Sequence, residues 1–160
     1  AEVRVGRARD WATTFGFRPV DVLLLDHRGT IYHEDLRAME PSLTLGARVF
    51  ADNVLLPGAP LFLHYVASKY DVQIHEVPEF DRPALRDWVV VCSRRLGSAA
   101  EAHGVDDADV KTDLWLSEFR HLSSEIDAIS WKSMHGLVDW VAFQQRLGPR
   151  LRLWRETQGL

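Results

Sequence analysis

The chain has 160 residues, a length that fits one domain or a small domain with an appendage. Its 46% hydrophobic and 26% charged residues suit a globular protein with a core, and a formal net charge of −4 argues against a nucleic-acid partner. One cysteine, Cys92, excludes an internal disulfide framework, and no apolar run in the sequence approaches the roughly 18 residues of a transmembrane segment.

The N-terminal part begins directly with the strand-like string AEVRV and shows no pattern of a signal or transit peptide. We therefore expect an intracellular protein, soluble or peripheral to a membrane, in a compartment that the sequence leaves open. Residues 2–5 read as a short strand that ends at Gly6, and residues 9–16 as a short helix. Residues 21–26 form a continuous apolar run closing on an acid, which is typical of a strand buried on both faces.

The middle of the chain is predicted to continue the alternation of helices and strands. A helix is expected over residues 35–45, with a break at Pro41, and a second buried strand over residues 47–53. A turn at Pro57 and Gly58 then leads into a helix over residues 61–68.

Two further strands are predicted, at residues 71–77 and 87–92, joined by a hairpin-like connection at Arg82 and Pro83. The expected order is therefore β-α-β-α-β-α-β-β, in which the final pair of strands is antiparallel.

The last third is predicted to be a helical extension behind an acidic linker. Residues 98–113 are small, polar and acidic, and residues 114–160 contain four of the six tryptophans. Five apolar residues follow one another at 4-3-4-3 spacing, which indicates an amphipathic helix: Trp115, Phe119, Leu122, Ile126 and Ile129. Residues 134–141 either extend this helix or begin a second one.

Polar side chains follow two of the predicted strands at the point where each strand ends. Asp26 closes the first strand, and Asp52 and Asn53 close the second. Because parallel strands in an open α/β sheet place their carboxyl ends side by side, these side chains should converge. Two carboxylates and an amide oxygen suit a hard cation such as Mg²⁺. The structural alternative is that each acid caps the helix or turn that follows it.

Two strings in this region resemble the catechol O-methyltransferase family. They are LLLDHRGTIY at residues 23–32 and ARVFADNVLLPGAPLFLHYV at residues 47–66. The resemblance covers residues 3–95 and implies an α/β fold: the C-terminal half of the Rossmann-like sheet of a class I S-adenosylmethionine-dependent methyltransferase, mostly parallel with an antiparallel last strand. Residues 1–97 would form this half domain. The family's glycine-rich cofactor turn and ribose-binding acid have no counterpart here.

The resemblance also implies roles for particular residues around a catechol. Asp26, Asp52 and Asn53 match the family's Mg²⁺ ligands, which orient the catechol and lower the pKa of the hydroxyl to be methylated. Glu79, the candidate catalytic carboxylate, matches the residue that holds the second hydroxyl. Pro57 matches a proline that walls the substrate pocket.

On the cofactor side, the resemblance places Ala8 and Arg9 at positions that contact adenine and His27 beside S-adenosylmethionine. Two positions depart from the family. Arg28 replaces an aromatic residue near the adenine, and Gly29 replaces the lysine that serves as general base. Removal of a proton by a positioned base contributes roughly 10²–10⁴-fold in rate, so this loss is severe.

These features favour a degenerate catechol O-methyltransferase-like chain that acts as a non-catalytic structural or accessory subunit of a larger assembly. One alternative is the catalytic half of a Mg²⁺-dependent O-methyltransferase whose cofactor-binding half lies on another chain. S-adenosylmethionine would then bind only with that second half. A third possibility is a module that binds a metal or catechol-like ligand without turnover.

A protein partner is expected in the accessory hypothesis, because half of a sheet exposes an open edge. That edge is predicted at Val3 to Val5. The aromatic residues of the 114–160 tail would either anchor a partner or pack back on the sheet.

Overall fold

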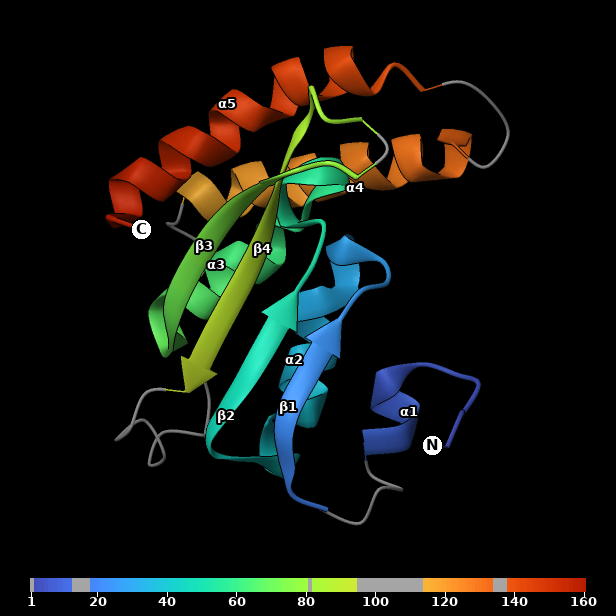
Figure 1. Ribbon diagram of the computed structural model, residues 1–160, viewed down its shortest axis with the longest axis vertical. Helices are drawn as coiled ribbons and strands as arrows, with labels where there is room; N and C mark the ends of the chain where they lie inside the picture. The colour runs from blue at the N-terminus through green and yellow to red at the C-terminus, as the bar shows by residue number, and fades with distance from the viewer. Residues whose placement is uncertain (1, 13–17, 81, 95–113, 134–137) are drawn as a thin grey trace.

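The computed structural model describes residues 2–12, 18–80, 82–94, 114–133 and 138–160 (Figure 1). The predicted linker at residues 98–113 lies outside these ranges. So do the end of the first predicted helix near Gly16 and the junction at residues 134–137.

The described strands form one mixed sheet in the order β1-β2-β4-β3. Its strands are β1 (Val20–Leu25), β2 (Leu43–Ala51), β3 (Tyr70–Pro78) and β4 (Arg86–Arg94). β1 and β2 are parallel, and β4 is antiparallel to both of its neighbours, β2 and β3. Three strands therefore share one direction and only the last opposes them. This confirms the predicted half of a methyltransferase sheet with its antiparallel last strand.

Helices and turns connect these strands as the sequence pattern predicts, with shifted boundaries. They are α1 (Ala8–Ala12), η1 (Gly29–Ile31), α2 (Tyr32–Met39), η2 (Glu40–Ser42), η3 (Val54–Gly58) and α3 (Pro60–Lys69). The helix expected over residues 35–45 instead begins at Tyr32 and ends at Met39. Pro41 lies in the short 3-10 turn η2, and Leu43 already begins β2. The proline ends the helix because it has no N–H to donate.

The predicted strand at residues 2–5 is wrong. These residues have no regular structure, and Val3 and Val5 are 90% and 91% exposed. Their backbone has no strand to pair with, and the chain turns at Gly6, whose φ of 138° favours glycine. Among the described strands the sheet edge on this side is β1, which pairs only with β2, and the opposite edge is β3.

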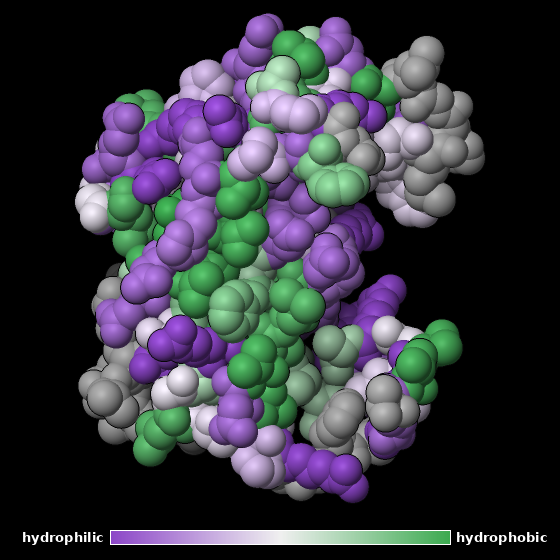
Figure 2. Space-filling view, viewed as in Figure 1, coloured by the Kyte–Doolittle hydropathy of each residue, from purple (hydrophilic) through white to green (hydrophobic). Residues whose placement is uncertain are grey.

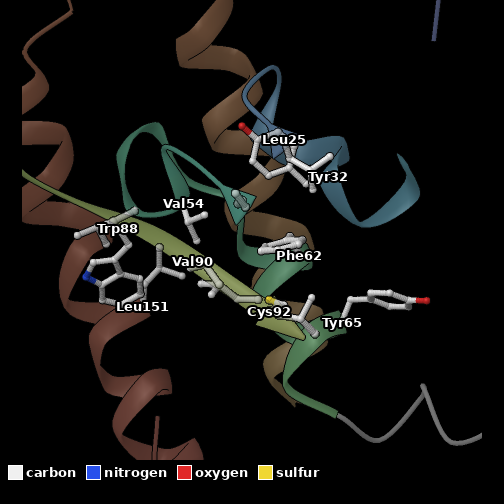
Figure 3. Packing of buried hydrophobic residues seen from close by; sticks show 14 of the residues in the cluster. Leu25, Tyr32, Val54, Phe62, Tyr65, Trp88, Val90, Cys92 and Leu151 are labelled. Carbon is white, nitrogen blue, oxygen red and sulfur yellow. The ribbon is translucent and has the colours of Figure 1, made fainter. Parts of the chain in front are cut away.

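One hydrophobic core joins the sheet to the helices behind it (Figure 3). Tyr32, Phe62 and Trp88 are fully buried there, together with Val90 and Cys92 of β4. Burial of the Cys92 thiol raises its pKa to about 12. Cys92 is therefore a buried apolar residue, as its place in the run WVVVC indicates.

The C-terminal tail folds back on the same core. It consists of α4 (Leu114–Ser133) and α5 (Trp140–Gln158), which lie across the end of the sheet to which the arrowheads of β1 and β2 point (Figure 1). Phe119, Leu122 and Ile126 of the predicted stripe are buried, and the rings of Phe119 and Trp154 have centroids 5.4 Å apart. The apolar stripe of α4 is thus satisfied within the chain.

The Phe119→Ala variant tests this packing. We expect the free energy of unfolding to fall by about 3–5 kcal/mol, because the substitution leaves a cavity between α4 and α5. Urea denaturation measures the loss, and Trp131→Ala, at a side chain that is 60% exposed, is the control. If Phe119→Ala cost no more than the control, the tail would not share the core.

Candidate functional site

The two predicted metal acids lie at adjacent strand ends. Leu25 pairs in register with Ala51, and the backbone N–H of Asp52 donates to the Leu25 carbonyl at 3.0 Å. Asp26 and Asp52 each follow one member of that pair. The expected convergence of the strand ends is therefore seen in the backbone, with Asp26 exposed and Asp52 half-buried.

The side chain of Tyr32 links the segments that follow the ends of β1 and β2. Its one hydroxyl proton is shared between the backbone oxygens of Asp52, at 3.1 Å, and His27, at 3.4 Å, and the residue is fully buried. Burial raises the pKa of the hydroxyl, so it stays protonated and can keep donating. In the sequence, Tyr32 only contributes to the resemblance of residues 23–32 to the methyltransferase family. The structure shows that its side chain links the loop after β1 to the loop after β2.

Asn53 begins the loop that follows β2 in a left-handed conformation, with φ 55° and ψ 36°. Asparagine tolerates this conformation better than most residues. Its backbone N–H donates to Oδ1 of Asp52 at 2.9 Å, and its side-chain Nδ2 donates to Oδ2 of Asp87 at 2.8 Å. The side chain is thus fixed on one side by a residue of β4.

Asp87 organises the η3 loop, a role that the sequence analysis missed. The residue is 1% exposed, and its Oδ1 accepts from the backbone N–H groups of Leu55 at 3.0 Å and Leu56 at 2.9 Å. Burial raises the pKa of this carboxyl, and the hydrogen bonds it accepts oppose that rise. The only signal in the sequence is an acid immediately before the apolar run WVVVC.

Pro57, the predicted wall of the substrate pocket, is a half-buried member of the same η3 loop. It follows Leu56, which Asp87 holds by the backbone. Glu79 lies on the turn between β3 and β4, where its N–H donates to the Leu85 carbonyl at 3.0 Å. Because Val77 pairs with Asp87, the same hairpin carries Glu79 and the residue that anchors Asn53.

The donor set around the strand ends limits which cation it could hold. Across the described residues, no group of three or more His, Cys, Asp or Glu side chains is arranged to hold a metal ion. A cation here would have two carboxylates and the amide oxygen of Asn53, all hard oxygen donors. Mg²⁺ fits such a set because it keeps several waters and takes few protein ligands.

Gly29 lies where the fold leaves no space for a side chain. A Cβ at this position would be 2.7 Å from the backbone oxygen of Gly58. Gly58 has φ 122°, and a Cβ there would be 2.9 Å from Cδ1 of Ile126 in α4. The glycine at position 29 therefore lets η1 pack closely on η3, and a residue with a Cβ would require these loops to separate.

The side chain of Arg28 forms an ion pair with the C-terminal tail. Its Nη2 is 2.6 Å from Oδ2 of Asp127 and its Nε donates to Oδ1 at 2.9 Å, a bidentate pair that joins the β1 loop to α4. Thr30 also donates to Asp127, at 2.7 Å. Partial burial raises the pKa of Asp127, but the bonds from Arg28 and Thr30 outweigh it and hold the pKa below its usual value.

A cavity of about 600 Å³ lies between the N-terminal segment, β1 and α2. Ala8 and His27, two of the predicted cofactor residues, line it together with Trp11 and Leu24. Arg9 is not among the lining residues, and its guanidinium instead approaches Glu34 at 3.9 Å. The structure therefore brings together two of the three residues predicted for the cofactor side.

His27 lines one side of this cavity, and its ring is held in place by a hydrogen-bond partner. Its Nε2 is 2.7 Å from Oδ2 of Asp35, a carboxylate of α2 that is 5% exposed. Nothing in the sequence pattern singled out Asp35. The pair holds the His27 ring against Tyr32, with ring centroids 4.9 Å apart.

Comparison with known proteins finds partial sequence matches to O-methyltransferases. The chain is 38% identical over 96 residues to the transmembrane O-methyltransferase of Homo sapiens, a match that covers 55% of this chain and 33% of the relative. It is 42% identical over 73 residues to the transmembrane O-methyltransferase homolog of Mus musculus (43% of this chain, 28% of the relative). It is 36% identical over 69 residues to catechol O-methyltransferase B of Danio rerio (39% and 26%).

The fold comparison agrees with the sequence comparison. A putative O-methyltransferase from Klebsiella pneumoniae superposes with a TM-score of 0.51 at 14% identity, over 59% of this chain and 50% of that structure. No family model matches the chain. The chain spans about a third of the length of the curated relatives it matches. None of the helices among the described residues is long and apolar enough to span a bilayer.

Gly29→Ala tests the contact between η1 and η3. We expect the free energy of unfolding to drop by about 1–3 kcal/mol, because the added Cβ overlaps the Gly58 carbonyl oxygen. Gly29→Lys should lose a similar amount, since both variants share the clash at Cβ. Thermal unfolding measures both, and an alanine variant as stable as the native chain would contradict the contact.

A double-mutant cycle on Arg28→Ala and Asp127→Ala tests the connection to α4. At pH 7 we expect a coupling of up to about 1 kcal/mol, because the Arg28 side chain is half exposed. A carboxyl with a lowered folded pKa stabilises above its unfolded pKa, so the coupling should vanish as the pH falls through the lowered value. The control cycle on Arg146 and Glu125, in which Nη2 and Oε2 are 3.5 Å apart, should give a smaller coupling free energy.

Proposed function

We propose, from the premise that this chain carries a segment homologous to O-methyltransferases, that it is a non-catalytic accessory protein derived from that family. The observation that carries the proposal is the 2.7 Å approach of a Cβ at Gly29 to the Gly58 carbonyl oxygen. It supports the proposal because a side chain at this position, where the resemblance expects the lysine base, would require the loops at Gly29 and Gly58 to separate.

The adjacent residue Arg28 does not compensate for the base. Arg28 stays protonated and cannot accept a proton from a catechol hydroxyl. Its guanidinium is also bound to Asp127 in two places. Without a positioned base, methyl transfer would lose roughly 10²–10⁴-fold in rate.

An accessory role needs a surface for a partner, and we assign that surface to the edge and open face of β1. Val22 and Leu24 are 61% and 66% exposed, although they lie on a strand of the sheet. Figure 2 shows the hydrophobic column that runs over this face of the sheet. An open strand edge with exposed apolar side chains is an aggregation hazard unless another chain covers it.

The acidic strand ends remain competent for a cation in this proposal. Asp26 and Asp52 would supply carboxylates and Asn53 an amide oxygen to Mg²⁺, which as a Lewis acid would polarise a bound hydroxyl. The chain itself orients these groups through the paired strand ends and the η3 loop.

A second candidate function is the catalytic half of a Mg²⁺-dependent O-methyltransferase completed by another chain. The cavity beside β1 favours it, because Ala8, Trp11 and His27 line that cavity next to the acidic strand ends. S-adenosylmethionine would then lie between this cavity and the glycine-rich turn of the second chain.

Calorimetry with S-adenosylmethionine and a methylation assay on catechol with Mg²⁺ separate the two candidates. For the purified 160-residue chain we expect neither binding nor methylated product. Cofactor binding by this chain alone would overturn the accessory proposal. Co-purification of an equimolar second polypeptide with a strand and a glycine-rich turn, together with activity of that complex, would establish the second candidate instead.

A further inference from the structure

The side-chain amide of Asn53 can present either its oxygen or its nitrogen to the acidic strand ends, and only the oxygen can bind a cation. The two orientations have nearly the same shape, so packing alone does not select one. One orientation of the amide is therefore favoured only by a hydrogen-bond partner that acts solely as an acceptor or solely as a donor.

Asp87 is such a partner. Its Oδ1 accepts from the backbone N–H groups of Leu55, Leu56 and Trp88, at 3.0, 2.9 and 2.6 Å. Its Oδ2 is left for the Asn53 side chain, at 2.8 Å. An ionised carboxylate has no proton to donate, so Oδ2 of Asp87 can only accept from Asn53, and the amide turns its NH₂ toward β4.

We propose that Asp87 is a positioning residue that fixes the amide of Asn53 with its oxygen directed to a divalent cation held by Asp26 and Asp52. The inference rests on the cation site proposed above. It adds a residue from β4, 34 positions along the chain from Asn53, that contributes no ligand of its own.

The rigidity of this arrangement follows from the surroundings. Asp87 is 1% exposed, so water does not compete for its oxygens. The same carboxylate fixes the backbone on the far side of Asn53, while Asp52 Oδ1 accepts from the Asn53 backbone N–H at 2.9 Å. The ligand is therefore held at its backbone and at its side chain, as outer partners hold the ligands of protein metal sites.

Terbium luminescence sensitised by tryptophan, with Mg²⁺ as competitor, tests the inference on the full chain. We expect Asp87→Asn to weaken terbium binding by about 10- to 100-fold, because an amide at position 87 can donate and lets Asn53 turn over. Asp139→Asn is the matched control, since Asp139 accepts a backbone N–H from Ala142 at the start of α5. The control should bind terbium as the native chain does.

The Asn53→Ala background separates positioning from general structural damage. If Asp87 acts through Asn53, Asp87→Asn should cause no further loss of terbium affinity in Asn53→Ala. An additional loss of the same size in that background would overturn the inference. So would an Asp87→Asn variant that folds and binds terbium as tightly as the native chain.

A second measurement covers the case in which Asp87→Asn fails to fold. In the native chain, the side-chain NH₂ of Asn53 should exchange with solvent at least tenfold more slowly than that of Gln73, which is exposed. Equal exchange rates would overturn the positioning role. Native chain that binds no terbium, or whose binding survives Asp26→Asn and Asp52→Asn, would overturn the cation site itself and the inference with it.

Discussion

The close approach of Gly29 to Gly58 is the contact on which the arrangement of the site depends. It brings together the loops that leave β1 and β2. The absence of a side chain at Gly58 also lets Ile126 of α4 pack directly against its backbone. A side chain at Gly29 would meet the backbone oxygen of Gly58 and force the two loops apart, and one at Gly58 would be strained by its φ of 122°. The same small residues that let the two loops approach each other also let Ile126 of α4 pack against Gly58.

The C-terminal tail is bound to this contact by polar and apolar interactions. Arg28 and Thr30 converge on Asp127, and two turns earlier in α4 the buried ring of Phe119 packs against Trp154 of α5. Further ion pairs join α4 to α5 through Glu118 with Arg150 and Glu125 with Arg146. Such exposed pairs contribute little each, so the buried aromatic contacts carry most of the stability of the tail.

A buried carboxylate supports the same region from the sheet side. Asp87 loses hydration on burial, and four hydrogen bonds compensate for that loss. The η3 loop between Asn53 and Gly58 therefore has a fixed backbone where many loops at strand ends are mobile.

Much of the fold follows from local sequence pattern. The apolar runs closing on Asp26 and Asp52, the hairpin of β3 and β4, and the stripe on α4 are signals within short windows, and the structure confirms these strands and the helix. The expectation that residues 21–26 are buried on both faces is wrong, because Val22 and Leu24 of the edge strand β1 are 61% and 66% exposed. The strand expected at residues 2–5 failed because a strand needs a partner, and β1 is the edge of the sheet. The helix expected to reach Leu45 ended early because Pro41 and the pairing of β2 prevailed over side-chain spacing.

The sequence by itself determined which residue types stand at the strand ends, since Asp26, Asp52 and Asn53 are fixed by their place after apolar runs. Only the tertiary structure decided what surrounds them. Asp87 reaches Asn53 across 34 residues, and Asp127 reaches Arg28 across 99. No local pattern encodes such pairs, because they arise from strand order and helix packing. The space denied to a side chain at Gly29 is likewise a property of three segments meeting in the fold.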